Sequence, residues 1–160
     1  MLCIGAPDDR LSCARSVGAD DVLNFMSGDE SQRRQWVLDR TGGRGADVTI
    51  ECTGAPAAVA QAMRCTRDAG KVVVVGQYTD HGDTPLNPHL DLNKKHLDVR
   101  GCWGSDYSHF HRAVEMLRTQ RARTLWSSFR LDRYPLSDVN ATLETVAAGK
   151  VVKALVVPPP

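Results

Sequence analysis

Two short runs of β-branched residues, each ending near a glycine, constrain the fold of this chain more than any other feature. The first run is Val48–Cys52, shortly before Gly54, and the second is Lys71–Val75, directly before Gly76. A helix-length segment, Pro56–Thr66, lies between them. Strand, helix and strand in this order form a right-handed crossover, which brings the carboxyl ends of two parallel strands to one edge of a sheet. The pattern predicts an α/β fold with a shared crevice at that edge.

The alternation of strands and helices continues on both sides of these runs. The expected strands are Met1–Ile4, Asp21–Leu23, Val48–Cys52, Lys71–Val75, Leu97–Gly101, Phe129–Leu131 and Val151–Val157. The expected helices are Pro7–Val17, Asp29–Arg40, Pro56–Thr66, His89–Lys95, Ser105–Gln120 and Ser137–Ala148, with Ser137 as a cap and Gly18 as a helix stop. This regularity predicts a doubly wound parallel sheet. The near-continuous valines of Lys71–Val75 predict a strand that is buried on both faces.

Composition excludes several classes of partner. Twenty Lys and Arg against nineteen Asp and Glu leave a formal charge of +1, so no basic field attracts nucleic acid or an anionic membrane. No apolar run approaches the ~20 residues of a membrane span, and no signal segment opens the sequence. The expected location is therefore the cytoplasm, with neither nucleic acid nor membrane as a partner.

The cysteines and histidines do not form a recognisable metal or disulfide framework. The five cysteines are odd in number and none forms a C-x-x-C pair, so we expect buried free thiols. They are Cys3, Cys13, Cys52, Cys65 and Cys102. His109 and His111 are two residues apart on an expected helix and diverge, so no metal site is predicted in this chain.

Four motifs, taken in their order and spacing, resemble the C-terminal half of the zinc-type medium-chain dehydrogenases, the alcohol dehydrogenase superfamily. They are Gly42–Val48, Glu51–Gly54, Gly70–Gly76 and Ala148–Ala154. Asn87–His89 and Gly101–Ser105 also fit members of the polyol and threonine dehydrogenase type. The resemblance covers essentially the whole chain and implies a Rossmann-type fold.

The resemblance implies that this chain contains two segments of the family's enzymes and lacks the part that precedes them. Residues 1–103 are expected to form a partial NAD(P)-binding Rossmann domain, and residues 104–160 a segment that returns to the catalytic domain. The family's first strand, its G-x-G-x-x-G turn and its zinc ligands have no counterpart here, so we expect a truncated piece of a dehydrogenase. Such a chain has no catalytic residue or zinc of its own, and its sheet has two unpaired inner edges.

The resemblance also implies where a nicotinamide dinucleotide binds. Three groups of positions match the adenosine side, the nicotinamide ribose and the carboxamide: Cys52, Thr53 and Gly54; Val75, Gly76 and Gln77; and Gly101, Cys102 and Trp103. Lys153 matches a basic position near the pyrophosphate. Asp47 and Glu51 flank a strand in the manner common to the family, so acid–base catalysis is not expected of them.

The choice between NAD and NADP stays open. Gly5 stands where the family has an acid that binds the adenosine ribose, and Arg10 matches a basic position that reaches the ribose. Both favour a 2′-phosphate, whereas the charges of Asp8 and Asp9 oppose one.

The predicted function is the cofactor-binding part of an oxidoreductase that moves hydride between nicotinamide and a secondary alcohol or polyol. One alternative is a fragment of a zinc-independent quinone or enoyl reductase. Another is a noncatalytic nucleotide-binding or interaction module, and a Rossmann-like methyltransferase is more distant. A homo-oligomer could form through Leu97–Gly101, the strand that often pairs across a dimer axis in the family.

Overall fold

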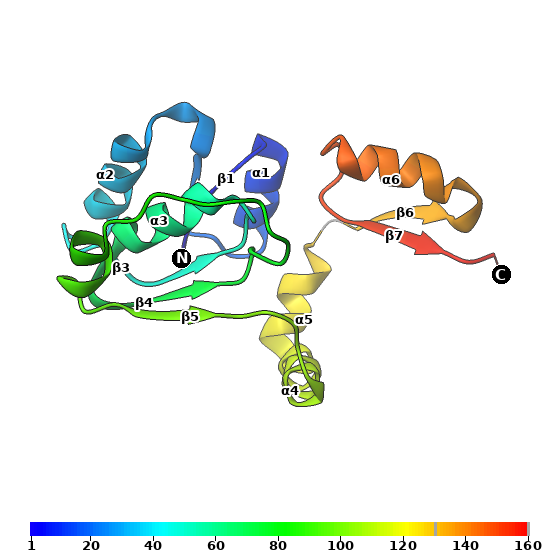
Figure 1. Ribbon diagram of the computed structural model, residues 1–160. Coiled ribbons are helices and arrows are strands. Elements are labelled where there is room, and N and C mark those ends of the chain that lie inside the picture. Colours follow the sequence, from blue (N-terminus) through cyan, green and yellow to red (C-terminus); the bar gives the residue numbers. More distant parts are fainter. Residues whose placement is uncertain (130, 160) are drawn as a thin grey trace. The chain divides into compact units, whose positions relative to one another are not determined.

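The structure is a computed structural model that describes residues 1–129 and 131–159 (Figure 1). The chain divides into two compact units. The central unit is Gly28–Phe110, and the terminal unit combines Met1–Ser27 with His111–Pro160. Every strand pair within the described residues is parallel, which confirms the predicted α/β class. The predicted boundary between a cofactor-binding segment, residues 1–103, and a segment of the catalytic domain, residues 104–160, is a different kind of division and stays a prediction.

The central unit contains a three-stranded sheet in the order β3-β4-β5 (Figure 1). Its elements are α2 (Glu30–Arg40), β3 (Ala46–Glu51), α3 (Pro56–Cys65), β4 (Thr66–Val74), the short helix η2 (Pro88–Asn93) and β5 (Asp98–Gly101). Thr49 lies opposite Val72 and Ile50 opposite Val73. The prediction that the two valine-rich runs are neighbouring parallel strands is therefore confirmed.

The terminal unit contains two separate two-stranded sheets, β1-β2 and β6-β7. Its elements are β1 (Leu2–Gly5), α1 (Asp8–Ser16), β2 (Asp21–Asn24), η1 (Phe25–Ser27), α5 (Gln120–Ser127), β6 (Asp132–Pro135), η3 (Leu136–Asp138), α6 (Val139–Ala147) and β7 (Ala154–Val157). Helix α4 (Tyr107–Leu117) crosses the sequence boundary between the two units. No helix in the described part of the chain is long and apolar enough to cross a membrane.

Local chemistry explains where the helices begin and end. Asp29 caps α2: its carboxylate accepts a hydrogen bond from the Gln32 N–H at 2.8 Å, and the Gln32 side chain accepts one from the Asp29 N–H at 2.9 Å. This reciprocal pair satisfies two backbone donors that have no partner inside the helix. Pro56 begins α3, where its missing N–H costs nothing. Gly18 follows α1 with φ of +106°, as expected of a helix stop.

The core of the central unit lies between α3 and one face of the sheet. Ala62 and Met63 of α3 pack against Val72, which is fully buried, and Val59, Val74, Leu97 and Val99 surround them. Side chains alternate between the faces of a strand, so Val48 and Ile50 of β3 lie on the other face, where they are 54% and 61% exposed. Val75, directly after β4, is also exposed. In Lys71–Val75 only Val72 is buried, whereas Lys71, Val73 and Val74 are half-buried, so the prediction that this strand is buried on both faces was wrong, because α3 covers only one face.

The structure corrects the predicted element bounds in several places. Strand β4 begins at Thr66 rather than Lys71, because Ala46 pairs with Thr66 before the register shifts. The helix expected to reach Gln120 ends at Leu117, and a separate helix α5 follows. Thr119 separates the two: its backbone is extended, and its hydroxyl accepts a hydrogen bond from the Ala122 N–H at 3.2 Å. This capping geometry interrupts the apolar periodicity.

The C-terminal strands and their cap also differ from expectation. The strand predicted at Phe129–Leu131 falls partly on Arg130, outside the described residues, and β6 begins only at Asp132. Strand β7 begins at Ala154 instead of Val151. Ser137 lies in η3 and does not cap α6, since its hydroxyl donates to the Asp138 side chain at 2.9 Å.

All five cysteines are free thiols, but only Cys65 is buried. Burial raises the pKa of the Cys65 thiol. The half-buried Cys3 thiol also has a raised pKa for the same reason. Cys52 and Cys102 are exposed, because each follows the end of a strand where the chain leaves the core. The prediction of buried thiols was wrong for these two residues.

Candidate functional site

The carboxyl ends of β3, β4 and β5 meet at one edge of the central sheet, called here the strand-end edge. The predicted segments Cys52–Gly54, Val75–Gln77 and Gly101–Trp103 lie at this edge. The Val75 and Gly76 N–H groups both donate to the Glu51 carbonyl, at 2.9 and 3.0 Å. The Cys102 N–H donates to the Val74 carbonyl at 2.9 Å. These bonds extend the sheet beyond its strands and bring the three segments side by side.

Two loops of the strand-end edge touch through their backbones alone. A Cβ atom at Gly76 would lie 2.5 Å from the Gly54 nitrogen and 2.6 Å from the Thr53 nitrogen, closer than real Cβ atoms approach. Gly54 has a φ of +76°, and a Cβ there would lie 3.0 Å from the Gly76 carbonyl oxygen. By contrast, a Cβ at Gly101 would meet no atom within 4 Å. The edge therefore combines a close backbone contact with an open position.

Glu51 organises the loop after β3. The residue is only 3% exposed, and its Oε1 atom accepts hydrogen bonds from the Thr53 N–H, the Thr53 hydroxyl and the Gly54 N–H, at 2.5, 2.7 and 3.1 Å. Its Oε2 atom is buried and has no hydrogen-bond partner among the described residues. Asp47 pairs instead with Arg67 at 2.6 Å, which lowers the pKa of that carboxyl group. The two carboxylates thus have separate partners and do not form an acid–base pair.

An aromatic pair joins the loops after β4 and β5. The Trp103 Nε1–H donates to the Tyr78 carbonyl at 3.2 Å, and the two rings stack with centroids 5.8 Å apart. Between Gly76 and Tyr78, the Gln77 Nε2 atom is buried without a partner in the described structure. Tyr78 was not among the predicted site residues. The signal that could have found it is an aromatic side chain directly after a predicted strand-end segment.

Three predicted cofactor positions belong to the terminal unit. Gly5 ends β1 and lies opposite Asn24 of β2, and Arg10 is exposed on α1. Asp8 accepts a hydrogen bond from the Asn24 side chain at 2.6 Å. Lys153 directly precedes β7, and its carbonyl accepts from the Asp132 N–H at 3.1 Å. The structure therefore groups the predicted positions of the central unit at one edge and describes these three within the other unit.

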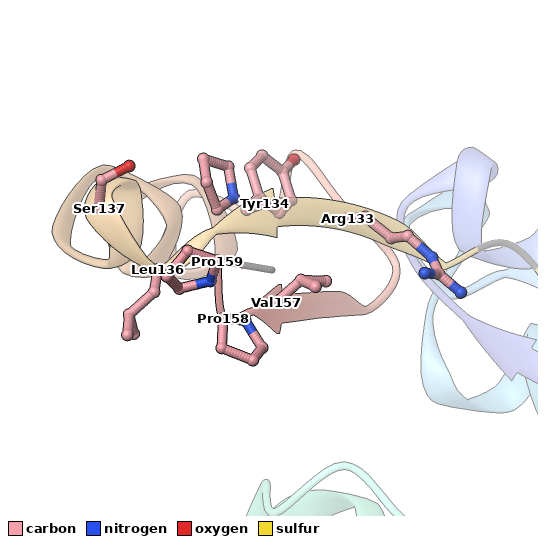
Figure 2. A pocket seen from close by; sticks show the side chains of 8 residues that line it. Arg133, Tyr134, Leu136, Ser137, Val157, Pro158 and Pro159 are labelled. Atoms are coloured by element: carbon pink, nitrogen blue, oxygen red, sulfur yellow. The ribbon is translucent and has the colours of Figure 1, made fainter.

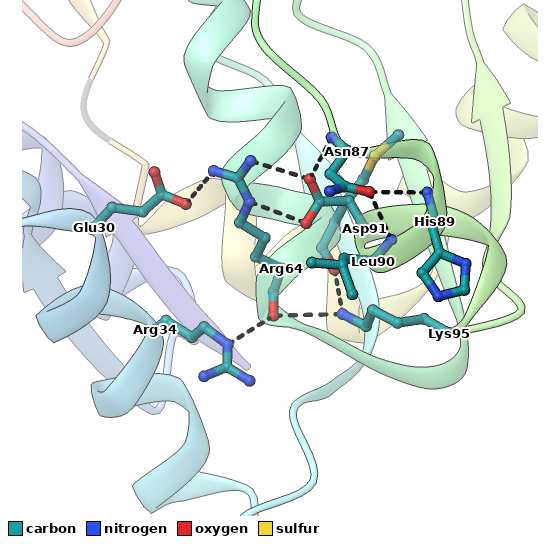
Figure 3. Close-up of polar contacts among 9 residues, drawn as sticks. Glu30, Arg34, Arg64, Asn87, His89, Leu90, Asp91 and Lys95 are labelled. Carbon is teal, nitrogen blue, oxygen red and sulfur yellow. Dashed lines mark hydrogen bonds and ion pairs between the residues drawn. The ribbon is translucent and has the colours of Figure 1, made fainter.

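A charged cluster beside α3 holds the segment that follows β4 (Figure 3). The Arg64 guanidinium donates to both carboxylate oxygens of Asp91, at 3.1 and 3.0 Å, and to Glu30 at 2.8 Å. Asp91, only 7% exposed, also accepts from the Asn87 N–H at 3.0 Å. The guanidinium holds the pKa of Asp91 below its ordinary value, and the two carboxylates raise that of Arg64. The cluster anchors η2 and the chain before it.

Lys95 completes this anchor at the end of α3 (Figure 3). Its ammonium donates to the carbonyls of Met63 and Thr66, at the position where backbone acceptors of a helix lack internal partners. Burial lowers the pKa of Lys95. Sequence reasoning missed the whole anchor, because Arg64 and Asp91 are 27 residues apart and neither follows a strand.

The terminal unit has a shallow hollow at the carboxyl ends of β6 and β7 (Figure 2). Its lining includes Arg133, Tyr134, Leu136, Val157 and Pro158. None of the predicted cofactor positions lines this hollow. Across the described residues, no group of three or more His, Cys, Asp or Glu side chains is placed to hold a metal ion.

Comparison with known proteins shows the family to which the chain is related. An alcohol dehydrogenase of Cupriavidus necator is 37% identical over 148 residues, which cover 92% of this chain and 39% of that protein. The 5-exo-hydroxycamphor dehydrogenase of Pseudomonas putida is 26% identical, with 92% of this chain and 40% of that protein covered. The chain thus spans about 40% of the length of these curated relatives.

A solved structure shows the same arrangement. The alcohol dehydrogenase of Thermotoga maritima superposes with a TM-score of 0.87 at 29% identity, covering 99% of this chain and 43% of that one. The family model described as zinc-binding dehydrogenase matches residues 3–119, which include most of β1, all of β2 to β5 and the whole strand-end edge. This chain therefore belongs to the zinc-binding dehydrogenase family.

Proposed function

We propose that this chain is the nicotinamide-dinucleotide-binding part of an oxidoreductase that acts on an alcohol or polyol. The observation that carries the proposal is the backbone contact between the loops after β3 and β4, at Gly54 and Gly76. Ligands of open parallel sheets bind outside the carboxyl ends of the strands. A side chain at Gly76 would collide with the loop after β3, so glycine is what allows the two strand ends to lie this close together at the edge where such ligands bind.

Each segment of the strand-end edge has a role in this proposal. Cys52–Gly54 lies under the adenosine ribose, Val75–Gln77 beside the nicotinamide ribose, and Gly101–Trp103 holds the carboxamide through backbone groups. In the terminal unit, Gly5 and Arg10 bind the adenosine ribose and Lys153 meets the pyrophosphate. The bound dinucleotide supplies the hydride acceptor, and this chain orients it.

Two buried polar atoms support the fit of a polar ligand at the edge. Glu51 Oε2 is an acceptor and Gln77 Nε2 a donor, and both lack a partner among the described residues. Leaving such groups unpaired costs about 1–3 kcal/mol each. Between NAD and NADP the chain offers opposing features: the neutral Gly5 admits a 2′-phosphate, and the Asp8 carboxylate, bonded to Asn24, opposes one.

NADH titration of the ¹⁵N-labelled 160-residue chain, followed by NMR, tests the proposal. We expect amide shifts at Cys52–Gly54, Val75–Gln77 and Gly101–Trp103. Gly101→Val is expected to weaken binding about tenfold, since its side chain enters the ligand's space while meeting no protein atom within 4 Å. Arg100→Val, on the same strand, is the control and leaves binding unchanged. Shifts confined to the hollow between β6 and β7, or none at millimolar NADH, would contradict the proposal.

A noncatalytic nucleotide-binding module is the second candidate. The strand-end edge, where three loop segments converge, is the observation that this candidate shares with the first proposal, and the two candidates differ only in whether hydride transfer follows binding. In the first proposal, zinc belongs to residues of the whole enzyme outside this chain. An assay of the chain alone with NAD, zinc and a secondary alcohol is expected to show no turnover. Measurable oxidation of the alcohol by the chain alone would exclude the noncatalytic module.

We also propose that the protein is located in the cytoplasm and that two copies of it associate through β5. β5 lies at the edge of the central sheet and pairs on one side only, with β4, so its other side carries unpaired backbone groups. Light scattering after size exclusion is expected to give the mass of a dimer. Asp98→Pro, which removes a donor from β5, is the diagnostic variant. A monomeric wild-type chain contradicts this part alone.

A further inference from the structure

Two large aromatic side chains at the strand-end edge are exposed and yet held in place. Tyr78 is 66% exposed and Trp103 is 76% exposed. Their rings stack at 5.8 Å with an interplanar angle of 22°, and the indole N–H is bonded to the Tyr78 carbonyl. An exposed aromatic pair that is already ordered presents a rigid apolar surface on which a ligand can pack without further ordering of the side chains.

The pair connects the two segments assigned to the nicotinamide end. The Tyr78 N–H donates to the Gly76 carbonyl at 2.8 Å, which turns the chain directly after β4. Trp103 directly follows Cys102, whose N–H is bonded to Val74. The indole hydrogen bond therefore closes a bridge between the loop after β4 and the loop after β5. No predicted cofactor position on the adenosine side takes part in this bridge.

We propose that Tyr78 and Trp103 form an aromatic clamp that sets the spacing of Val75–Gln77 and Gly101–Trp103, and so selects for the nicotinamide half of the dinucleotide. This inference rests on the proposed function. Both residues are positioning residues. The Tyr78 hydroxyl has no part in the clamp, because the acceptor is the backbone carbonyl and the stacking uses the ring.

The test compares two ligands that differ only at the nicotinamide end. Dissociation constants for NADH and ADP-ribose are measured by calorimetry on the 160-residue chain. Trp103→Ala removes the stacking and the hydrogen bond, and is expected to weaken NADH binding about tenfold. ADP-ribose binding is expected to change by less than about twofold. Trp103→Phe keeps a ring but loses the donor, and is expected to have an intermediate effect.

Two control variants separate the clamp from a general loss of aromatic surface. Tyr107→Ala removes another exposed aromatic ring of the central unit, outside the clamp, and is expected to bind NADH like the wild type. Trp126→Ala removes a comparable pair in the terminal unit, where Trp126 is 53% exposed and packs edge-on against Phe129 at 5.3 Å. It is expected to leave both dissociation constants unchanged. Thermal unfolding of Trp103→Ala is expected to match the wild type, since both clamp rings are exposed.

The outcomes distinguish this inference from the function on which it rests. If Trp103→Ala weakens NADH and ADP-ribose equally, or neither, while the wild type binds both, the clamp is refuted and the binding function stands. If the wild-type chain binds neither ligand, the proposed function is wrong and the clamp is refuted as well. A partner protein that binds through Trp103 while NADH affinity is unaffected would also overturn the inference.

Discussion

Helix α3 and the C-terminal helices α4, α5 and α6 bury very different amounts of apolar surface. In the central unit, α3 buries Ala60, Ala62, Met63 and Cys65. In the second half of the chain, α4 has no buried residue, α5 buries only Ala122, and α6 buries only Thr142. Leu143 and Val146 of α6 are 61% and 39% exposed. An amphipathic pattern thus predicts α3 and α6 equally well, but the described chain covers the apolar face of α3 far more completely than that of α6.

This difference bears on the candidate site. The strand-end edge lies on the unit with the continuous core, whose loops are tied together by Glu51, by Gly76 and by the Arg64–Asp91 cluster. Sites are held accurately when rigid elements support them. The expected effects of substitution on the stability of this unit decrease from Gly76 through Val72 to Asp91.

Gly76→Ala is expected to have the largest effect. Its Cβ would lie within 2.7 Å of backbone atoms of Thr53, Gly54 and Cys52, so the loops after β3 and β4 must separate. We expect a loss of about 3 kcal/mol in the free energy of unfolding, measured by urea denaturation. Gly101→Ala, at an open strand end of the same sheet, is the control and is expected to be neutral. Equal stability of the two variants would show that the backbone contact is not required.

Val72→Ala tests whether the core is confined to the central unit. Val72 is fully buried against α3, and the cavity left by its truncation is expected to destabilise the protein by about 2.5 kcal/mol. The same change at Val146, which is 39% exposed in the terminal unit, is expected to cost less than about 0.5 kcal/mol. Comparable losses in the two variants would remove the distinction between the units.

Asp91→Ala tests the charged cluster. It leaves the Arg64 guanidinium with Glu30 alone and the Asn87 N–H without its acceptor. We expect a loss of about 2 kcal/mol, because the carboxylate is almost fully buried. Asp98→Ala removes a carboxylate that pairs with Arg100 and Lys71 at an exposed position, and is expected to change the unfolding midpoint negligibly.

The smallest expected effect is a change in acid sensitivity. The folded-state pKa of Asp91 is lowered by Arg64, so its contribution is complete above the unfolded value of about 4 and is lost as pH falls through the folded value. Between pH 6 and pH 3, Asp91→Asn is therefore expected to lose less stability than the wild type. Urea midpoints at the two pH values measure this. A steeper loss in the variant would contradict the assigned direction.

Local patterns predicted much of the central unit from the sequence alone. Runs of β-branched residues predicted β3 and β4, and Asp29 and Pro56 predicted the starts of α2 and α3. Parallel strand order then placed Cys52–Gly54 beside Val75–Gln77, because these segments follow neighbouring strands.

What could not be predicted depends on contacts between distant residues. Arg64 and Asp91 show no local signal, and the exposure of Val48 depends on which sheet face a helix covers. Helix α5 was not predicted, because the expected helix ended at Gln120 and the start of a new helix there depends on the cap formed by Thr119. Tyr78 and Trp103 meet only because two loops converge.

The contact between Gly54 and Gly76 also limits how this protein can be redesigned. There is no room for a side chain at Gly76, so any larger residue there would require both neighbouring loops to be rebuilt together. Gly101, which faces open space, and the exposed thiol positions Cys52 and Cys102 are where new chemistry can be introduced one residue at a time.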